Sequence, residues 1–568
     1  MREIRMLAGK LGVPVGEEPL GSVSHHFRGG KQFTGARHFG RVVYRDVYPG
    51  VDLQFRMTGK SVEYDFVVRP HAGASAIRMR FDGARVFEGA GGELVLRAGE
   101  AELRHRKPVV LQDGKTIDGA FAVRRGEVRF ELGTYDPSKP LVIDPVVEFA
   151  TLLGGGSIDY INATTTDSAG NIYLVGTTYS APPYAFPNKL GVLAPLTPEG
   201  DVFVTKISSD GKTLIWTAFL GGRFTDSGSG IALGSDGSVF VTGATTSPDF
   251  PTTTGVYQPQ LSTQSSNYYS PSDAFVARLG PAGDTVLYST YLGGAGNDGG
   301  QRITVDSGLN AFVAGNTNSY GFPTTSNALR ATKTGQTADL DVFVSKLSPL
   351  GNLLLYSTFW GGFADESVGG LAVDATGAVY VAGNTASTDF ITTAGTIKPA
   401  ANLNYYSDGD GFVTKFIPGT ATPIYSTFYG GSSRESITSL AVDAAGNAHI
   451  AGQTSSYDFP LLPVPGTRPN ISADVFAAKI NPTATAILYS RVIPASGEDI
   501  ANSIALDSTG VLYVAGSTSS GNFPLVGTPA QSVFSVSDNN QRVGFLMALS
   551  PAGGAHRLDI RFRAPRGN

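Results

Sequence analysis

The chain of 568 residues is too long for one ordinary domain and long enough to bury a substantial core. Its 32 Phe and 23 Tyr exclude a disordered chain, and its lack of cysteine excludes disulfides, thiolate chemistry and cysteine-bound zinc. The formal net charge of −5 combines a basic front, residues 1–145, with an acidic remainder, residues 146–568, of net charge −10. Because nucleic-acid binding needs a basic surface, we expect no nucleic-acid partner.

The first 40 residues are weakly patterned, and we expect them to form a weakly ordered or truncated edge. The opening stretch, Met1 to Gly16, has no apolar core of signal-peptide length. No apolar run in the chain is long enough to span a bilayer as a helix. We therefore expect no transmembrane segment, and no signal peptide is visible in this chain.

Short stretches in which polar and apolar residues alternate follow from Arg41 to Pro145. Examples are Val51 to Phe55, Val62 to Val68 and Glu127 to Leu132, with turn residues between them. A period of two places one face of each strand on a core and the other in water. Residues 1–145 are therefore predicted to form an antiparallel, β-sandwich-like domain of unknown function.

Residues 146–568 contain one unit of about seventy residues six times, seen most cleanly from Tyr356 to Ile424. Apolar residues at helical spacing are nearly absent, and each unit contains four strand-like segments. One glycine of the unit recurs at intervals of 64 to 72 residues, at Gly176, Gly243, Gly315, Gly383, Gly452 and Gly516. This period predicts an all-β fold in which every unit is one four-stranded blade of a β-propeller.

The four strands of a unit are counted in chain order, for example Leu371 to Asp374, Val379 to Gly383, Asp410 to Phe416 and Tyr425 to Tyr429. Short hairpins are predicted between the first and second strands and between the third and fourth strands. The wide link, from the second to the third strand, is long and variable. The glycine link, from the fourth strand to the next unit, carries Gly-Gly. Both emerge at one face, the link face, where binding sites usually lie.

The order of these motifs carries a resemblance to a known family. YST-x-x-GG, VD-x-x-G-x-x-YVAG-x-T, S-x-DFP and DVFV-x-K follow one another as in the SBBP repeat of bacterial β-propeller proteins, which they resemble. VYPGVDLQF (Val47 to Phe55), VEYDFVV and KPLVIDP (Lys139 to Pro145) together resemble the uncharacterised domain that often precedes those repeats. The resemblance implies an extracytoplasmic location, secreted or at the cell surface, and no established activity.

The number of blades has two candidate values. The resemblance implies seven blades, whereas the chain shows six units. The fourth-strand segment, however, occurs seven times. We therefore expect a terminal fourth strand, either Val146 to Leu153 or Arg557 to Arg563, to complete a blade begun at the other end of the chain.

An acidic residue stands five positions after the first residue of the glycine pair, or of its replacement, in all six units. These residues are Asp159, Asp226, Asp298, Glu366, Glu435 and Asp499. If they surround one mouth of the channel, they form a site for a basic group or for a cation such as calcium. The alternative, which we expect, is that each carboxylate accepts hydrogen bonds from backbone N–H groups of its own loop. No other metal or cofactor is indicated.

Two further sets of side chains recur. Two wide links share Asn-Tyr-Tyr-Ser and present Tyr268, Tyr269, Tyr405 and Tyr406, which suit contacts with a sugar or a protein but also suit packing over neighbouring blades. A basic residue stands five positions after the Asp of the third strand, at Lys206, Arg278, Lys346, Lys415 and Lys479. These basic residues are expected to form salt bridges from one blade to the next or to extend along the surface.

Signals of catalysis are weak. Apart from the adjacent His25 and His26, no two histidines stand at ligand spacing, and there is no GxSxG, phosphate-binding or HExxH motif. The sequence therefore favours a non-catalytic scaffold whose link face binds a protein or a carbohydrate ligand. The alternative is a propeller enzyme acting on polysaccharide, a lyase or a hydrolase, which would need titratable groups converging in one pocket of the link face.

Overall fold

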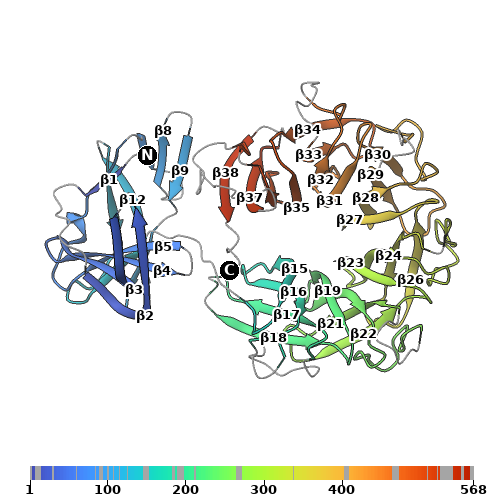
Figure 1. Ribbon diagram of the computed structural model, residues 1–568, viewed down its shortest axis with the longest axis horizontal. Helices are drawn as coiled ribbons and strands as arrows, with labels where there is room; N and C mark the ends of the chain where they lie inside the picture. The colour runs from blue at the N-terminus through green and yellow to red at the C-terminus, as the bar shows by residue number, and fades with distance from the viewer. Residues whose placement is uncertain are drawn as a thin grey trace. The chain divides into compact units, whose positions relative to one another are not determined.

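The computed structural model describes residues 3–562 apart from short gaps. The longest gaps are 7–14, 145–152, 188–196, 264–270, 402–408, 463–471 and 525–541. Strands and loops make up the described residues, together with one short 3-10 helix, Ala74–Ala76. The chain divides into two compact units, Met1–Leu152 and Leu153–Asn568 (Figure 1).

The N-terminal unit contains three antiparallel sheets, with the strand orders β11-β10-β14-β5-β4-β3-β2, β1-β6-β13-β12 and β7-β8-β9. The strands are β1 (Glu3–Met6), β2 (Val15–Arg28), β3 (Lys31–Tyr48), β4 (Val51–Thr58), β5 (Ser61–Val68), β6 (Met79–Asp82), β7 (Arg85–Glu88), β8 (Leu94–Ala98), β9 (Ala101–His105), β10 (Val109–Gln112), β11 (Lys115–Ile117), β12 (Gly119–Arg124), β13 (Glu127–Leu132) and β14 (Leu141–Asp144). The predicted strands at residues 51–55, 62–68 and 127–132 are all present.

One hydrophobic core joins the two larger sheets of this unit. Phe66 of β5 and Phe130 of β13 meet edge to face, with ring centroids 5.8 Å apart. Phe121 of β12 packs against Phe130 at 5.3 Å, and Met79 of β6 is fully buried in the same cluster. Apolar residues from both sheets thus face one another, as the alternating pattern requires. The predicted sandwich-like domain is confirmed.

The first 40 residues include β1, β2 and the start of β3, and their expected character as a weakly ordered or truncated edge stays a prediction. β1 pairs with β6, and the long strands β2 and β3 pair with each other at the end of the seven-stranded sheet. The register between β2 and β3 shifts between Pro19 and Val23 and again between Ser24 and His26. Each shift is a bulge or irregularity in the backbone pairing of the two strands.

The C-terminal unit consists of six four-stranded antiparallel sheets, which we number as blades one to six in chain order. Their strands are β15 (Asp159–Thr166), β16 (Ile172–Thr178), β17 (Asp201–Ile207), β18 (Leu214–Leu220); β19 (Asp226–Leu233), β20 (Val239–Thr245), β21 (Asp273–Leu279), β22 (Val286–Leu292); β23 (Asp298–Val305), β24 (Ala311–Thr317), β25 (Asp341–Leu347), β26 (Leu354–Trp360); β27 (Glu366–Val373), β28 (Val379–Thr385), β29 (Asp410–Phe416), β30 (Tyr425–Tyr429); β31 (Glu435–Val442), β32 (Ala448–Thr454), β33 (Asp474–Ile480), β34 (Ile487–Ile493); and β35 (Asp499–Leu506), β36 (Leu512–Thr518), β37 (Val543–Leu549), β38 (Ala555–Phe562).

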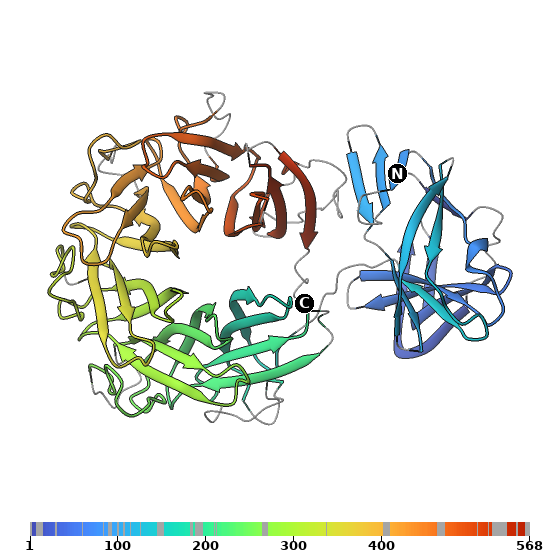
Figure 2. The same ribbon diagram turned by 180° about the vertical axis from the view of Figure 1, so that it is seen from behind.

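The blades are arranged around a central channel, with the first strand of each blade innermost and the fourth outermost (Figures 1 and 2). Hydrophobic clusters lie between successive sheets, so each blade buries its faces against its neighbours. A phenylalanine of the wide link packs on the third-strand phenylalanine in each blade. Phe322 and Phe343 of blade three, for example, stack with ring centroids 4.3 Å apart.

The recurring glycine of the second strand is explained by a close approach of backbones. A Cβ atom on Gly243 would clash with the carbonyl oxygen of Ser227 in the adjacent inner strand, and one on Gly315 would clash with that of Gly299. The same approach occurs in all six blades. The inner strand bulges next to this glycine, since the register of β19 and β20 shifts between Gly228 and Gly230.

The expected exchange of a terminal strand is absent from the described residues. Blade six takes its fourth strand, β38, from its own repeat, and blade one is already complete with β18. The other candidate strand, Val146 to Leu153, lies outside the described residues except for Leu153. Successive inner strands contact one another from β15 to β35, and no comparable contact between described residues joins β35 to β15 (Figure 1). Because each repeat supplies four paired strands, no blade needs a strand from the other end.

The wide links do more than form loops, because they return along the outer strands. In blade two the N–H of Thr253 donates to the carbonyl of Ser289 in β22, and the N–H of Tyr291 donates to that of Gln258. Blade three repeats this with Thr325. These bonds occupy backbone groups at the exposed edge of the fourth strand, which protects that edge from pairing with another chain.

Candidate functional site

The six acidic residues predicted from the glycine links all open inner strands, at the link face of the propeller. Asp226, Asp298, Glu366, Glu435 and Asp499 are buried, and Asp159 is half-buried. In every blade but the sixth, one carboxylate oxygen of this residue accepts a hydrogen bond of 2.7 to 2.9 Å from the N–H of a glycine in the link; the donors, in chain order, are Gly155, Gly222, Gly294, Gly362 and Gly431. In the sixth, the Ser520 hydroxyl donates to Asp499 at 2.8 Å.

Hydroxyl groups at the end of the second strand or just after it complete each of these contacts. In blade four the Thr385 hydroxyl donates to Glu366 Oε1 at 2.6 Å, while the N–H of Gly362 donates to Oε2 at 2.9 Å. Blade three uses Ser319, whose hydroxyl donates to Asp298 at 2.8 Å. The described partners of each carboxylate thus lie in its own link and its own blade, as expected for loop capping. A ligand-binding role for the six residues stays a prediction.

A second carboxylate lies beside five of the six acidic residues, all except Asp159, at the boundary between two blades. It belongs to the aspartate that opens the third strand of the preceding blade, and all five are buried. Gly293 shows the spacing: a Cβ atom there would lie 2.6 Å from Asp273 Cγ and 2.8 Å from Asp298 Oδ2. We call these carboxylate pairs junctions one to five: Asp201 with Asp226, Asp273 with Asp298, Asp341 with Glu366, Asp410 with Glu435 and Asp474 with Asp499.

Burial favours the protonated form of the carboxyl groups at the junctions. The negative charge of the paired aspartate adds to this effect. Burial raises the pKa of Asp226, Asp298, Glu366 and Glu435 to about 7, and that of Asp499 to about 6, with the paired aspartate adding to each rise. Burial likewise raises the pKa of Asp201 and Asp273 to about 6. The described repulsion among these carboxylates is therefore between neighbours in pairs.

Two junctions contain a lysine that the repeat pattern did not predict. Lys398 Nζ lies 2.9 and 2.8 Å from the two carboxylate oxygens of Asp410, and Lys333 Nζ lies 3.0 Å from Asp341 Oδ1. Both lysines come from wide links, and Lys333 is fully buried together with its partner. A buried ammonium group held by a carboxylate and by carbonyl oxygens is a charge-assisted contact. Because the wide links have no regular spacing, sequence periodicity gave no signal for either lysine.

The basic residues of the third strand form salt bridges, but each bridge lies within one blade rather than between blades as expected, because the acidic partner stands in the neighbouring turn of the same sheet. The partner is the aspartate in the turn between the first and second strands. The five pairs are Lys206 with Asp167 (3.5 Å), Arg278 with Asp236 (2.6 Å), Lys346 with Asp306 (3.1 Å), Lys415 with Asp374 (3.3 Å) and Lys479 with Asp443 (2.9 Å). These basic groups lie at the face opposite the link face, so they take no part in the candidate site.

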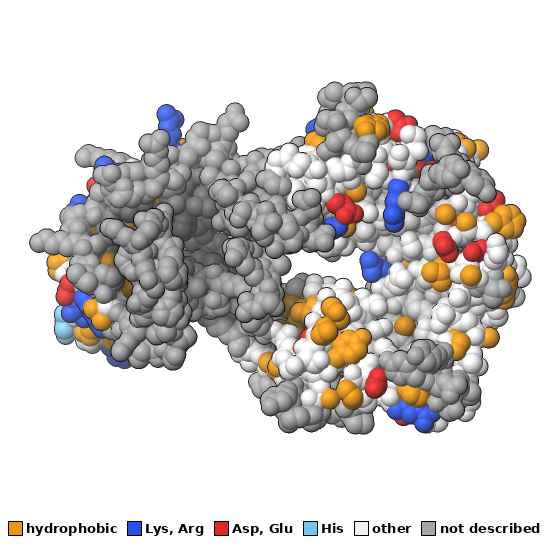
Figure 3. Space-filling model, viewed as in Figure 1, with side chains coloured by type: hydrophobic (Ala, Val, Ile, Leu, Met, Phe, Trp, Pro, Cys, Tyr) orange, Lys and Arg blue, Asp and Glu red, His pale blue; other side chains and the backbone are white. Residues whose placement is uncertain are grey.

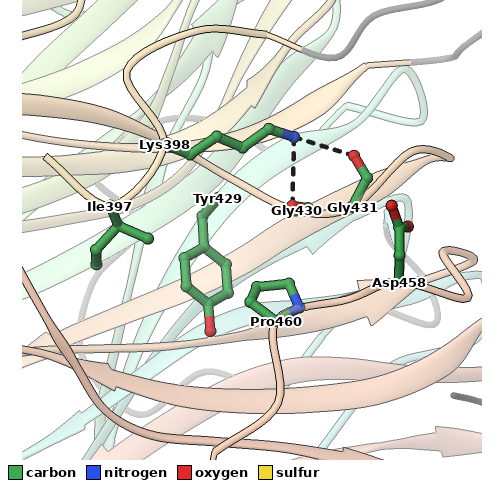
Figure 4. A pocket seen from close by; sticks show the side chains of 7 residues that line it. All are labelled: Ile397, Lys398, Tyr429, Gly430, Gly431, Asp458 and Pro460. Atoms are coloured by element: carbon green, nitrogen blue, oxygen red, sulfur yellow. Dashed lines mark hydrogen bonds between the residues drawn. The ribbon is translucent and has the colours of Figure 1, made fainter. Parts of the chain in front are cut away.

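A small pocket of about 180 Å³ lies at junction four (Figure 4). Its lining residues are Ile397, Lys398, Tyr429, Gly430, Gly431, Asp458 and Pro460. All three titratable side chains have structural partners: Lys398 Nζ donates to the carbonyls of Gly430 and Gly431 at 3.2 and 3.0 Å, the Tyr429 hydroxyl meets Ser490 Oγ at 2.8 Å, and Asp458 accepts from the N–H of Ser432 at 2.8 Å. The pocket is therefore a poor place for proton transfer.

The described residues hold neither a metal-binding cluster nor a helix fit to cross a membrane. They contain no group of three or more His, Asp or Glu side chains arranged to hold a metal ion. None of their helical segments has the length and apolarity that a membrane crossing requires.

Comparison with protein families matches both units. Residues 8–146 match a domain of unknown function, DUF7948, and residues 148–182, 287–323 and 495–524 match SBBP, the beta-propeller repeat. The chain carries SBBP β-propeller repeats after a DUF7948 domain. Each matched SBBP segment includes an acidic residue that opens an inner strand, namely Asp159, Asp298 and Asp499. No curated protein matches the chain.

Solved structures similar to this SBBP-repeat protein include several propellers of low sequence identity. A NanB sialidase from Streptococcus pneumoniae is 8% identical, with a TM-score of 0.35, and the match covers 82% of this chain and 86% of that one. An apocarotenoid oxygenase from Synechocystis is 10% identical, with a TM-score of 0.32 and coverages of 72% and 82%. A gluconolactonase from Xanthomonas campestris is 12% identical, with a TM-score of 0.27 and coverages of 65% and 95%. Likeness at these TM-scores carries no argument about function.

Aromatic side chains stand on the link face of the SBBP propeller, at positions other than those predicted. Tyr268, Tyr269, Tyr405 and Tyr406 lie outside the described residues. Tyr320 and Tyr457 follow the second strands of blades three and five and are 51% and 46% exposed, and Phe363 in the glycine link after blade three is 65% exposed. The Tyr320 hydroxyl donates to the carbonyl of Gly335 at 2.8 Å, which fixes its ring. These exposed aromatic residues stand at different positions in different repeats. This variation is visible in the sequence and could have pointed to them.

Proposed function

We propose that the protein is a non-catalytic extracytoplasmic or cell-surface scaffold whose link face binds a protein or a glycan. The observation that carries this proposal is the pair of exposed rings, Tyr320 and Phe363, on one side of the boundary between blades three and four. Both lie near Gly335: its carbonyl accepts the Tyr320 hydroxyl, and a Cβ atom on it would lie 2.8 Å from the Phe363 carbonyl oxygen. Large exposed apolar side chains that lie close together are typical of recognition surfaces.

The acidic and lysine side chains at the junctions are already hydrogen-bonded within the fold, which supports a binding role rather than catalysis. The acidic residues of the inner strands, Lys333 and Lys398 all hold parts of the fold together. An enzyme of polysaccharides needs two or more titratable groups free to meet one substrate. The described part of the pocket at junction four does not offer such a pair, because Lys398 and Asp458 are both hydrogen-bonded to the fold. The extracytoplasmic location rests on the resemblance of the repeats to exported proteins.

A glycan-array screen of the purified chain, repeated with Tyr320→Ala and Phe363→Ala, tests the proposal. Leu350→Ala is the matched control, because Leu350 is 70% exposed but lies in the third-to-fourth-strand turn at the opposite face of blade three. We expect binding that the two aromatic substitutions weaken and the control leaves unchanged. A protein ligand would be sought by the same variants in pull-down from an envelope extract. Binding that all three variants retain would place the site away from this surface.

A further inference from the structure

Side-chain hydrogen bonds link the inner strands of neighbouring blades in the middle of the channel. Each inner strand has a register shift, which leaves one residue unpaired at the bulge: Gln301 in blade three, Gly369 in blade four and Thr438 in blade five. Polar side chains use the backbone carbonyls at these bulges. Asn162 Nδ2 donates to the carbonyl of Gly228 in the next blade at 2.7 Å, and the Thr438 hydroxyl donates to that of Ala501 at 2.6 Å.

Arg302 makes the largest of these contacts. Its Nε donates to the carbonyl of Gly369 at 2.9 Å, its Nη1 to that of Gln301 at 3.2 Å and its Nη2 to that of Thr438 at 3.2 Å. The three acceptors are the bulge residues of three successive blades. The guanidinium group therefore reaches from blade three to blade five inside the channel. Figure 3 shows the hollow of the propeller with Lys or Arg side chains at its inner edge.

The position of Arg302 is otherwise occupied by small residues. The corresponding residues of the other five inner strands are Ala163, Gly230, Gly370, Ser439 and Ser503. A Cβ atom on Gly370 would clash with Leu440 of the next blade, which shows how closely the inner strands approach here. One repeat of six thus supplies a long cationic side chain where the packing favours a small one. The other hydrogen bonds described above between inner strands are made by the uncharged side chains of Asn162 and Thr438.

The charge of Arg302 has no acidic partner among the described residues. Its three acceptors are neutral carbonyl groups, and burial lowers its pKa with no carboxylate to offset that effect. The inner-strand acids hydrogen-bond to their own links instead. A guanidinium group has five N–H donors and stays charged, so two donors and a full positive charge are left over after these three bonds. A partly buried cation without a counter-ion is unfavourable.

We propose that Arg302 anchors an anion-binding site in the central channel and that its ligand presents a carboxylate group. A carboxylate matches the two remaining donors of a guanidinium fork in planar geometry. A dianion such as phosphate is less suited, since the repeat region carries a net charge of −10. The carboxylate belongs either to a uronic acid of a glycan or to an acidic side chain of a protein. This site is separate from the exposed rings of the link face, and it holds whether or not those rings bind.

Titration calorimetry of the full chain with sodium glucuronate tests one source, and titration with a short glutamate peptide tests the other. Glucose and sodium chloride at matched ionic strength are the blanks. We expect saturable binding of at least one carboxylate, a rise in melting temperature with it, and neither effect from the blanks. The arm that binds more tightly identifies the source. Absence of saturable binding in both arms overturns the proposal.

Variants of Arg302 distinguish a ligand-binding role of this residue from a purely structural role. Arg302→Gln should abolish the carboxylate-dependent rise in melting temperature, and Arg302→Lys should weaken it at least tenfold in affinity, because lysine keeps the charge but loses the fork. Arg223→Gln, at an exposed arginine of the first glycine link, should retain it. A rise that survives Arg302→Gln contradicts the proposal. If Arg302→Gln does not fold, Arg302→Lys decides: unchanged affinity in that variant also contradicts it.

Discussion

Junctions two and four each contain a pair of buried carboxylates at the equivalent place, but the charge of the pair is balanced in two different ways. At junction four, Lys398 places an ammonium group on Asp410. At junction two, the equivalent residue is Gln258: the carbonyls of Gln258 and Lys398 accept from the N–H groups of Tyr291 and Phe428 in corresponding outer strands.

Neutral donors therefore take the place of the ammonium group at junction two. Gln258 Nε2 donates to Asp273 at 2.9 Å, and the N–H of Ser262 donates to the same oxygen at 2.8 Å. The pair at junction two can lower its charge only by keeping a proton, whereas the pair at junction four is balanced by a lysine. One fold thus tolerates two solutions to the same electrostatic problem, and they should respond differently to mutation and to pH.

The largest effect is expected from removing the ammonium group at junction four. Lys398→Met should lower the free energy of unfolding by about 3–5 kcal/mol, because it leaves Asp410 and Glu435 buried without a cation. Urea unfolding measures this loss. The double variant Lys398→Met with Asp410→Asn should recover a large part of it. Lys415→Met is the control, since Lys415 pairs with Asp374 in a more exposed turn, and a loss as large in that variant would contradict the argument.

A smaller but still large effect is expected from filling the space between the carboxylates at junction three. A Cβ atom on Gly361 would lie 2.9 Å from Asp341 Cγ and would clash with Glu366 Oε2. Gly361→Val should therefore lower the free energy of unfolding by about 1–3 kcal/mol or cause aggregation. Gly299→Ala is the control, because the nearest atom to its added Cβ would be Ala244 Cβ at 3.7 Å. An unchanged melting temperature for Gly361→Val would mean that the glycine has another purpose.

The response to pH should distinguish junction two. Burial raises the pKa of Asp298 to about 7 and that of Asp273 to about 6 in the folded state, while both lie near 3.8 in the unfolded chain. The folded state therefore binds more protons between these values, so the stability that these groups contribute is full below pH 4 and falls as pH rises toward 7. We expect the free energy of unfolding to decrease between pH 5 and pH 8, by roughly 1–3 kcal/mol for this junction.

Two substitutions at junction two sharpen this pH experiment. Asp298→Asn removes one titrating group, and Gln258→Lys supplies the ammonium group that junction four has. Both should flatten the profile between pH 5 and pH 8, and Gln258→Lys should also raise the stability at pH 8. Urea unfolding at a series of pH values provides the data. A profile that is equally steep in both variants would show that other groups control it.

The repeat pattern predicted the strands, the six blades and the capping of the glycine links because each depends on residues at fixed spacing. The glycine at Gly243, the acid at Asp298 and the salt bridge of Lys346 recur in the repeats, so their environments follow from one blade. The pairing of Asp273 with Asp298 could have been found as well, since both recur and the glycine link that joins their strands is short.

Features that occur in a single repeat could not be predicted in this way. Lys398 stands in a variable link, and its contact with Asp410 depends on how that link returns along the outer strand. Arg302 reaches carbonyls of two other blades through bulges that alternation does not reveal. Irregular backbone, rather than unusual composition, marks where the repeat pattern gave no signal.

The smallest effect is expected from calcium. Calcium needs several oxygen ligands with lone pairs available, whereas Asp298 is buried and accepts from the N–H of Gly294 and the hydroxyl of Ser319. Calorimetry with millimolar calcium or with chelator should therefore give the same melting temperature. Asp298→Ala should lower the free energy of unfolding by about 1–3 kcal/mol through the unpaired N–H group, and by the same amount with and without calcium. A calcium-dependent rise in melting temperature that Asp298→Ala abolishes would show that the acidic residues bind the ion as a ring, because loop capping alone gives calcium no preference for the folded state.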